Sequence, residues 1–291
     1  MKTKHKLLYL CMLFVLPLME SCNPESDLDL PKVKKQIVVD GWIEQNSYPY
    51  VLLTYNSAFF SNLDSASFRS LVASRAKVTV SDGTISEVLT LSKDTNYFPP
   101  YIYKGTGDII GKAGGTYTLL IEDEIDTLSA TTTIPWPVFL DSIWFEPNSL
   151  NDTLGQIKGS FSDNANEKNY YRTLTKEIKN KLFVPTLISI FDDNYFNGQK
   201  FTFSLRKGPE TFLKPQFDIY FKKGENIWVK IETIDKASFE FWSEYQKEVL
   251  NSGNPFAGNH NTIPSNVKGG LGIWYGYGVS IYYVRSKSIV R

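Results

Sequence analysis

A single cysteine near the start of the chain is the clearest place for chemistry. Cys22 follows Ser21, and three lysines at Lys2, Lys4 and Lys6 precede the apolar run that leads to it. That run is twelve residues long counting its proline, shorter than the ~20 residues of a membrane-spanning helix. A positive start, a short apolar core and a small residue before the cleavage point are typical of a secretory signal peptide. We therefore predict a signal peptide over residues 1–21, after which the Cys22 thiol receives a diacylglyceryl group.

The residues just before this cysteine leave an alternative open. Met19 and Glu20 occupy positions where lipoproteins usually carry a leucine and a small residue. An ordinary secreted protein with an incidental cysteine is the other interpretation. We favour the lipoprotein because Cys22 lies where cleavage is expected and because the polar, proline-bearing segment 22–34 has the composition of a tether. Acyl chains contribute ~0.8 kcal/mol per buried CH₂, which is ample for stable membrane anchoring.

Histidine and cysteine are too scarce for the common catalytic and metal-binding arrangements. Without residues 1–21, His260 is the remaining histidine and Cys22 the remaining cysteine. One mature chain therefore has neither a histidine-based triad nor a multi-histidine metal site. We predict a protein that is not an enzyme and needs no cofactor or metal. Carboxylates are plentiful, so a carboxylate-based hydrolase remains a remote alternative.

The charge balance restricts the partners of the protein. The chain has 31 basic and 31 acidic residues, and removing residues 1–21 takes away three of the former and one of the latter, which leaves a net charge of −2. Nucleic-acid binding requires a basic stripe that a near-neutral chain of this kind lacks. We therefore expect no nucleic-acid partner.

Two polar loops have residue types that could bind a cation. In "DDNYFNGQ", Asp193 and Asn197 fit calcium-loop positions. However, Tyr195 occupies the third position of the loop, and Ser204 replaces the glutamate that normally closes it. "FSDNANEKNYYR" clusters Asp163 and several asparagines near Arg172. Asn and Asp side chains commonly bond the backbone of their own turn. We interpret both loops as turns, with a cation or ligand site as the alternative for the second.

A glycine-rich aromatic segment, "NVKGGLGIWYGYG", lies near the end of the chain. A phosphate-binding glycine loop would need a helix after it, and here β-like aromatic residues follow. Glycines between aromatic residues of a strand indicate bulges or close backbone packing. Five aromatic residues in and just after this segment are either a sugar-stacking platform or core residues with hydrogen-bonded rims, and the core interpretation is the more common one. They are Trp274, Tyr275, Tyr277, Tyr282 and Tyr283.

The first half of the mature chain must be a β-structure. Seven short segments with alternating polar and apolar residues, separated by turn signals, lie between residues 35 and 135. This pattern predicts an immunoglobulin-like β-sandwich, although the cysteine pair and tryptophan spacing of antibody domains are missing.

A domain boundary is predicted at "IPWPVFLD", because two prolines flank Trp136 and cannot lie in a central strand. Residues 136–291 then form a second mainly β domain, sandwich-like or barrel-like, with one packed helix near 236–251. Its strands are predicted at "DSIWFEP", "GQIKGSFSD", "NYYRTLTKEI", "QKFTFSLRKG", "FDIYFKKG" and "NIWVKIETID". The helix is indicated by Phe239, Trp242 and Tyr245 at helical spacing. We expect it to cover a strand pair formed by the C-terminal segment "GGLGIWYGYGVSIYYVRS".

The order of several segments resembles a known family. "IVVDGWI", "GGTYTLLI", "TTIPWP" and above all "NPF" followed by "SNVKGGLGIW" are similar to Bacteroidota outer-membrane lipoproteins filed as domain of unknown function 4249. The resemblance covers nearly the whole mature chain. It implies an outer-membrane location, in either leaflet, and a partner among the TonB-dependent transporters beside which such proteins often lie. It implies no catalytic residue.

The family-specific loop provides the candidate contact surface. "NPFAGNHNTIPSN" is thirteen residues without periodicity, and a loop of that length is often functional. We place the contact surface on Asn254, Pro255, Phe256, Asn266 and Trp274, with a purely structural clasp as the alternative. The expected function is that of a lipid-anchored accessory or binding protein that serves a TonB-dependent transporter in nutrient uptake. The alternative is a free-standing surface lipoprotein that binds glycans or peptides.

Overall fold

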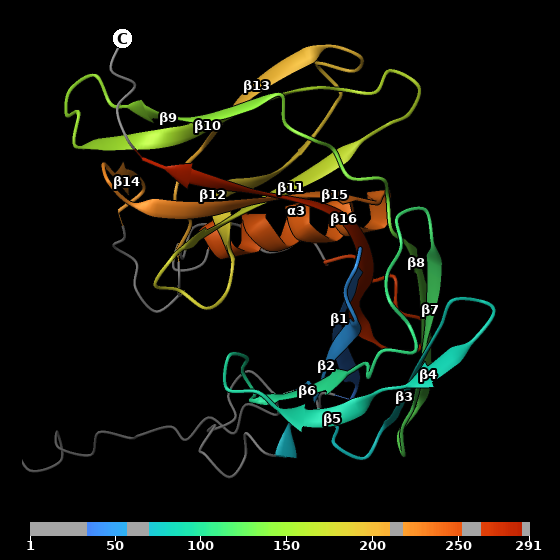
Figure 1. Cartoon of the computed structure of the whole chain (residues 1–291). Helices are drawn as coiled ribbons and strands as arrows, with labels where there is room; N and C mark the ends of the chain where they lie inside the picture. The colour runs from blue at the N-terminus through green and yellow to red at the C-terminus, as the bar shows by residue number, and fades with distance from the viewer. Residues whose placement is uncertain (1–33, 57–69, 210–217, 252–262, 287–291) are drawn as a thin grey trace, which may run out of the picture. The chain divides into compact units, whose positions relative to one another are not determined.

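The computed structural model describes residues 34–56, 70–209, 218–251 and 263–286 (Figure 1). This part of the chain is mainly β, as predicted, with one helix, α3 (Lys236–Asn251), and three sheets. The strands of the first half are β1 (Ile37–Glu44), β2 (Pro49–Tyr55), β3 (Lys77–Ser81), β4 (Ser86–Val88), β5 (Thr90–Lys93), β6 (Tyr101–Lys104), β7 (Thr116–Glu122) and β8 (Thr127–Thr133). Those of the second half are β9 (Ser142–Pro147), β10 (Leu154–Ser162), β11 (Tyr170–Glu177), β12 (Val184–Asp192), β13 (Lys200–Leu205), β14 (Phe221–Lys222), β15 (Asn226–Ile234) and β16 (Leu271–Arg285).

An eight-stranded sheet includes strands from both halves of the chain. Its order is β12-β11-β15-β16-β1-β2-β6-β5. Two four-stranded sheets pack against it: β4-β3-β7-β8, and a sheet in which β9, β13 and β14 each pair with β10. The 15-residue strand β16 joins the two parts of the large sheet. Its first half pairs in parallel with β1, from Leu271 to Tyr277, and its second half pairs with antiparallel β15, from Tyr277 to Arg285.

Two sandwich cores result from this arrangement. The first lies between β4-β3-β7-β8 and the part of the large sheet around β1, with Val39, Val78 and Leu119 fully buried. The second lies between the β9–β10 sheet and strands β11 and β15, and includes Phe161 and Val229. Strand β7 alternates strictly between exposed and buried residues, the pattern expected of a sheet with one face in a core. The predicted β-sandwich architecture is confirmed.

Glycines in β16 allow another segment to cross it closely. A Cβ atom at Gly276 would lie 3.0 Å from Ile134, and one at Gly278 would lie 2.3 Å from the carbonyl oxygen of Pro135. Gly272 has a φ of +103°, which favours glycine over any residue with a side chain. The segment "IPWP" therefore packs directly on β16, as the glycine pattern indicated, while the Trp136 ring stays 71% exposed.

The helix begins and packs much as the sequence predicted. Asp235 caps it, because its carboxylate accepts a hydrogen bond from the Ser238 backbone N–H at 2.8 Å. Phe239 and Trp242 pack against a buried cluster that includes Ile273 and Tyr275 of β16. Ile281, further along β16, is 47% exposed, so the helix covers only the first half of that strand.

Three expectations need correction. The chain from Lys35 onward is one compact unit and has no domain boundary at Trp136, because β16 pairs with strands of both halves. The C-terminal glycine–aromatic segment is one long strand, and no strand pair forms there. Strand β12 was missed because Pro185 and a short run of mixed residues weakened its signal, and Pro185 is tolerated at this position since β12 is an edge strand.

Candidate functional site

A recess lies on the face of the large sheet that points away from both sandwich cores. On β1, Val39 and Ile43 point into the first core, so Asp40, Trp42 and Glu44 point to the opposite face. The parallel register places Trp42 beside Tyr275 and Glu44 beside Tyr277 of β16.

Strands β15 and β11 extend the same face. Lys230 and Glu232 alternate with Val229 and Ile231, which belong to the second core. Arg172 of β11 pairs directly with Glu232, and directly opposed residues share a face. Side chains from four neighbouring strands therefore converge on one surface.

These side chains line a cavity of about 330 Å³. Its wall consists of Asp40, Trp42, Glu44, Leu52, Tyr97, Arg172, Leu174, Leu182, Phe183, Pro185, Lys230, Glu232, Trp242, Tyr275 and Tyr277. We call this cavity the recess. Helix α3 contributes Trp242, and the segment before β12 contributes Phe183, so elements outside the four strands close its sides.

Aromatic rings form a continuous wall in the recess. Trp42 stacks on Tyr50 with ring centroids 5.4 Å apart, lies 5.8 Å from Tyr97, and stacks on Tyr275 at 6.5 Å. Trp242 meets Tyr275 edge-on at 5.4 Å. Trp42, Tyr97 and Trp242 remain partly exposed, so part of this aromatic surface is open to a ligand.

Charged groups alternate across the floor of the recess. Lys230 Nζ lies 2.6 Å from the Glu44 carboxylate and 3.2 Å from that of Glu232. Arg172 Nη1 lies 3.2 Å from Glu232. Burial opposes the charge of Arg172, yet Glu232 and its other neighbours raise the pKa of the guanidinium above its usual value. Arg172 is therefore held in place and charged.

Two buried nitrogen atoms in this wall have no hydrogen-bond partner among the described residues. The Arg172 guanidinium lies over the Trp242 ring at 3.7 Å from its centroid, and Arg172 is only 7% exposed. Within the described part of the chain, neither Arg172 Nε nor Trp242 Nε1 finds an acceptor. Unsatisfied buried donors are uncommon, because each costs about 1–3 kcal/mol.

Asp40 is the carboxylate of the recess that no cation pairs with. It is exposed to the volume of the recess, and among the described residues no hydrogen bond or ion pair engages it. Protein atoms nevertheless surround it so closely that burial raises the pKa of Asp40 to about 6, while the charge of Arg172 limits the rise. A perturbed acid in a cleft is a recurring mark of functional sites.

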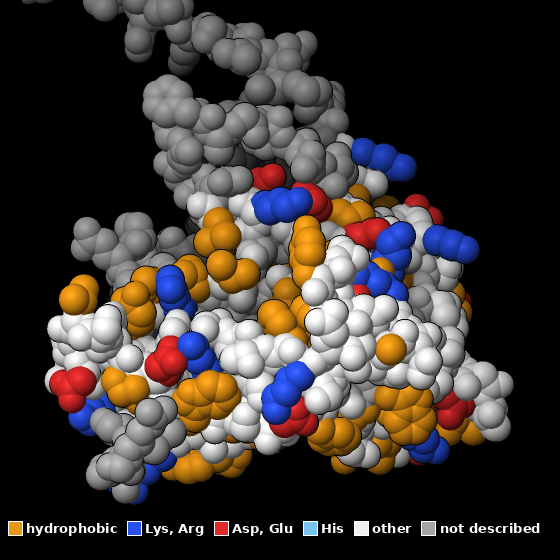
Figure 2. All heavy atoms as spheres, turned by 90° about the horizontal axis from the view of Figure 1, so that it is seen from above, with side chains coloured by type: hydrophobic (Ala, Val, Ile, Leu, Met, Phe, Trp, Pro, Cys, Tyr) orange, Lys and Arg blue, Asp and Glu red, His pale blue; other side chains and the backbone are white. Residues whose placement is uncertain are grey.

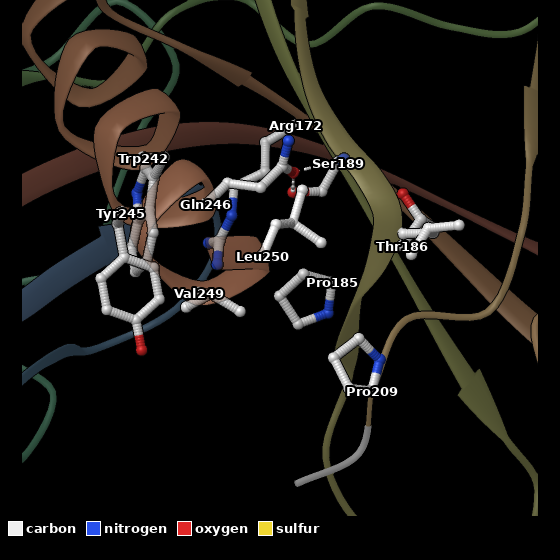
Figure 3. A pocket seen from close by; sticks show the side chains of 11 residues that line it. Arg172, Pro185, Thr186, Ser189, Pro209, Trp242, Tyr245, Gln246, Val249 and Leu250 are labelled. Carbon is white, nitrogen blue, oxygen red and sulfur yellow. Dashed lines mark hydrogen bonds between the residues drawn. The ribbon is translucent and has the colours of Figure 1, made fainter. Parts of the chain in front are cut away.

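A smaller apolar cavity of about 70 Å³ lies on the other side of the Arg172–Trp242 pair (Figure 3). Figure 3 shows Trp242 and Tyr245 of α3 facing Pro185 of β12 across it. The Gln246 side-chain oxygen accepts hydrogen bonds from the Ser189 backbone N–H at 2.7 Å and from its hydroxyl at 2.8 Å. This contact fastens α3 to β12 and so fixes the position of the Trp242 ring.

The predicted contact surface is only partly within the described residues. Asn254, Pro255 and Phe256 lie outside them. Asn266 is bonded to the backbone of Trp274, donating from Nδ2 to the carbonyl oxygen at 2.6 Å and accepting from the N–H at 2.9 Å.

Trp274 itself is fully buried in the first core and donates from Nε1 to the Tyr117 carbonyl oxygen at 3.0 Å. Its assignment to a contact surface was wrong, because a side chain on the core face of β16 cannot reach a partner. Of the aromatic platform considered there, Tyr275 and Tyr277 do lie in the recess.

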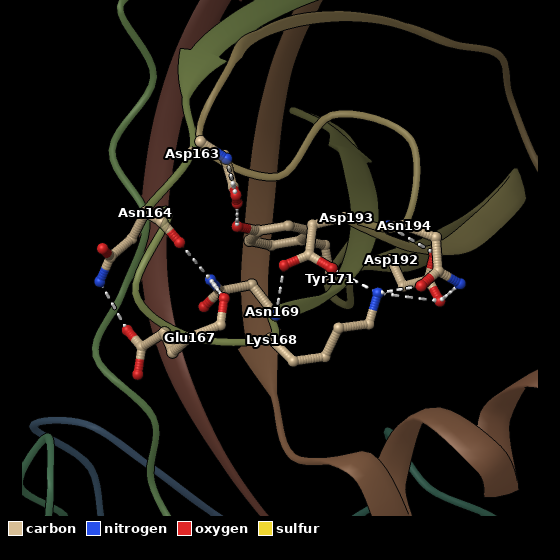
Figure 4. A network of polar contacts seen from close by, with 10 residues as sticks. Asp163, Asn164, Glu167, Lys168, Asn169, Tyr171, Asp192, Asp193 and Asn194 are labelled. Atoms are coloured by element: carbon tan, nitrogen blue, oxygen red, sulfur yellow. Dashed lines mark hydrogen bonds and ion pairs between the residues drawn. The ribbon is translucent and has the colours of Figure 1, made fainter.

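The two acidic loops form a structural cluster (Figure 4). Asp193 is fully buried, bonded by Lys168 Nζ and by the Asn169 backbone N–H at 2.7 Å. Asp163 accepts hydrogen bonds from the Tyr171 hydroxyl and from the Gly198 N–H. Other Asx side chains bond the backbone of their own turns, as predicted: Asn164 Oδ1 accepts from the Asn166 N–H, and Asp192 Oδ1 accepts from the Asn194 N–H. No group of three or more acidic, histidine or cysteine side chains in the described ranges could hold a metal ion.

Sequence reasoning overlooked Asp40, Trp42, Glu44 and Glu232, and it assigned Arg172 to the neighbouring loop. The available signal was the outward face of β1, on which a tryptophan stands between two acids. Arg172 lies on β11 beyond that loop, where pairing with Glu232 of β15 turns it into the recess. Cys22 lies outside the described residues, and no helix within them is long and apolar enough to cross a membrane.

The family model described as Domain of unknown function (DUF4249) matches residues 24–282. The chain belongs to the DUF4249 family. No curated protein matches the sequence of this DUF4249 protein.

Two solved structures show a distant likeness to the DUF4249 chain. A cytokine receptor complex is 8% identical, with 87% of this chain and 98% of that chain covered and a TM-score of 0.27. Bovine butyrophilin is also 8% identical, with 68% and 92% covered and a TM-score of 0.22. Both scores are too low for any conclusion about this protein.

Proposed function

We propose that this DUF4249 protein is a non-catalytic binding protein that holds a small ligand in the recess. The observation that carries the proposal is an aromatic-lined cavity of about 330 Å³ with a carboxylate, Asp40, that no hydrogen bond or ion pair from the described residues engages. That volume falls at the lower end of the range for ligand pockets. Unpaired polar groups in such a place lower stability unless a ligand satisfies them.

The binding function is tested through the fluorescence of the recess tryptophans. Trp42 and Trp242 line the recess, whereas Trp136 is 71% exposed and does not. A panel of oligosaccharides and short peptides should include a member that changes the emission spectrum with saturation. Trp42→Phe should remove most of that change, and Trp136→Phe, the matched control, should preserve it. A panel that produces no saturable change would refute the binding proposal.

The proposal also includes a location. A lipid on Cys22 would hold the protein at the outer membrane, beside a TonB-dependent transporter to which it passes its ligand. The signal-like N-terminus and the resemblance to outer-membrane lipoproteins support this part. Cys22→Ala should stop the incorporation of labelled palmitate. Continued labelling would remove the lipoprotein assignment.

Purification of the native lipidated protein in mild detergent tests the transporter partner. A TonB-dependent barrel that copurifies in near-equal amount would support the accessory role. Recovery of the protein alone, still with ligand-dependent fluorescence, would favour the free-standing glycan- or peptide-binding lipoprotein instead.

A carboxylate-based hydrolase is a second candidate, and one observation favours it. The pKa of Asp40 is raised by burial to about 6, which suits a general acid or base near neutral pH. Glu44 and Glu232 are engaged with Lys230 and Arg172, so within the described recess Asp40 has no second free carboxylate to work with. Release of product from a bound glycan, abolished in Asp40→Asn, would replace the binding proposal with this one.

A further inference from the structure

The charge balance of the recess restricts what it can bind. Three carboxylates, those of Asp40, Glu44 and Glu232, face two cations, Arg172 and Lys230. Lys230 is paired with both Glu44 and Glu232, and Arg172 is paired with Glu232. The unpaired charge is therefore negative, and it is located on Asp40.

The aromatic wall around that charge is suited to a cation. Trp42 follows Asp40 on the same face of β1, and Tyr275 lies beside Trp42. The protein's own cations already use this wall in the same way. Arg172 lies 3.7 Å from the centroid of the Trp242 ring, and Lys230 lies 4.6 Å from that of Tyr277. A ligand ammonium group near Trp42 would gain both a cation–π contact and the Asp40 carboxylate.

Arg172 and Trp242 belong to the wall of the recess. The guanidinium lies over the Trp242 ring at 3.7 Å from its centroid. Arg172 Nε and Trp242 Nε1 are shielded from solvent, so a ligand in the recess meets the Asp40 carboxylate and the aromatic rings and does not reach these two nitrogen atoms.

Building on the proposed binding function, we propose that the recess recognises a small ligand that carries a primary ammonium group. Asp40 and the ring of Trp42 bind that group. Two kinds of molecule present this chemistry. One is the amino terminus of a short peptide, and the other is an amino sugar.

Matched pairs of probes test the ammonium group directly. Isothermal titration calorimetry with the mature full chain in detergent would compare glycylglycine with N-acetyl-glycylglycine, and D-glucosamine with N-acetyl-D-glucosamine. Acetylation removes the charge and leaves most of the ligand unchanged. We expect the free amine of one pair to bind at least ten-fold more tightly at pH 7.5, and the pair that shows the difference identifies the ligand class.

Variants locate the effect. Asp40→Asn should abolish the preference for the free amine, and Asp108→Asn, a matched change at an exposed aspartate outside the recess, should preserve it. Equal binding of the free and acetylated members of both pairs would overturn this inference while leaving the binding function intact. The inference would also be overturned if only a neutral glycan bound and its binding depended on Trp42. If no probe in the fluorescence panel binds either, the proposed function fails as well.

Binding should also depend on pH in a defined direction. The groups facing Asp40 are Arg172 on β11, Tyr275 on β16, Tyr245 on α3 and Tyr97 before β6. All three tyrosines have a raised pKa, so among these groups only Asp40 titrates between pH 5 and 8. The affinity for the free amine should be highest near pH 7. It should fall towards ten-fold per pH unit below about pH 6, because protonation removes the charge of Asp40, and it should fall again above about pH 8, because the ligand's amino group then loses its proton. A flat profile between pH 5 and 8 would contradict a role for this carboxylate.

Discussion

The recess and the loop cluster on the neighbouring strands hold aspartates in opposite situations. Asp193 is fully buried, and Lys168 and the Asn169 backbone bond both of its oxygens. Asp40 is open to a cavity, and no described residue bonds it. A carboxylate whose bonds are satisfied within the protein stabilises a turn, whereas one left unsatisfied in a cavity is available to a ligand. Both regions contain aspartates, so residue type does not distinguish them. The hydrogen-bond partners of each carboxylate do distinguish the structural cluster from the candidate site.

The largest effect should come from breaking the charged floor of the recess. Arg172→Ala would leave Glu232, which is 2% exposed, without its guanidinium partner, and would remove the cation–π contact with Trp242. Loss of one partner of a buried pair costs about 3–5 kcal/mol. Urea unfolding should show this loss of stability.

A double variant tests the cause of that loss. Arg172→Met with Glu232→Gln removes both charges, and it should recover a substantial part of the stability. If the double variant is no more stable than Arg172→Ala, the charged pair is not the source of the effect.

The loop cluster should be the next most sensitive. Asp193→Ala would leave the Asn169 N–H without its acceptor and Lys168 without its buried partner. We expect a loss of about 2–3 kcal/mol in the free energy of unfolding, less than for Arg172 because the Lys168 side chain is 38% exposed and can turn to water. Ligand binding in the recess should be unchanged. If Asp193→Ala weakened ligand binding without lowering the free energy of unfolding, the loop cluster would be a binding site and not a structural one.

A smaller effect is expected from the phenol of the same cluster. Tyr171→Phe keeps the buried ring and removes the hydroxyl that donates to Asp163. Loss of a hydrogen bond to a charged group costs about 1.5 kcal/mol. Chemical denaturation checks the value, and Tyr195→Phe, at a tyrosine that is 94% exposed, is the control that should change nothing.

Asp40→Asn should give the smallest effect, with the opposite sign. The folded-state pKa of about 6 is above the usual 3.8, so the folded chain holds a proton that the unfolded chain releases between these values. Stability is therefore lost as the pH rises from about 4 to about 6, and the neutral amide avoids that loss. Because Asp40 is open to solvent in the recess, we expect a gain on the order of 1 kcal/mol at pH 7.5. The melting temperatures of the two proteins should converge at pH 4. A variant less stable than the parent at pH 7.5 would show that Asp40 is satisfied within the protein.

Local signals in the sequence were sufficient for most of the secondary structure. Alternation in "AKVTVSDG" and "GTYTLLIED" matches β3 and β7, and the spacing of Phe239 and Trp242 matches α3. These patterns can be recognised in the sequence because side chains alternate between the two faces of a strand and repeat every 3.6 residues around a helix, so the buried face imposes a local period. The edge strand β12 was missed because it contains Pro185 and because its buried residues do not alternate regularly with exposed ones.

The recess, in contrast, was decided by tertiary structure. Lys230 and Glu44 are 186 residues apart, and their ion pair exists because β16 joins β15 to β1 in one sheet. A parallel pairing between the first and last strands leaves no mark within either strand, so the two halves looked like separate domains. The sequence alone determined which residues of β1 face outward. Only the assembled sheet determined that Asp40 and Trp42 face a cavity shared with Arg172 and Trp242, because long-range strand pairing sets which outward faces meet.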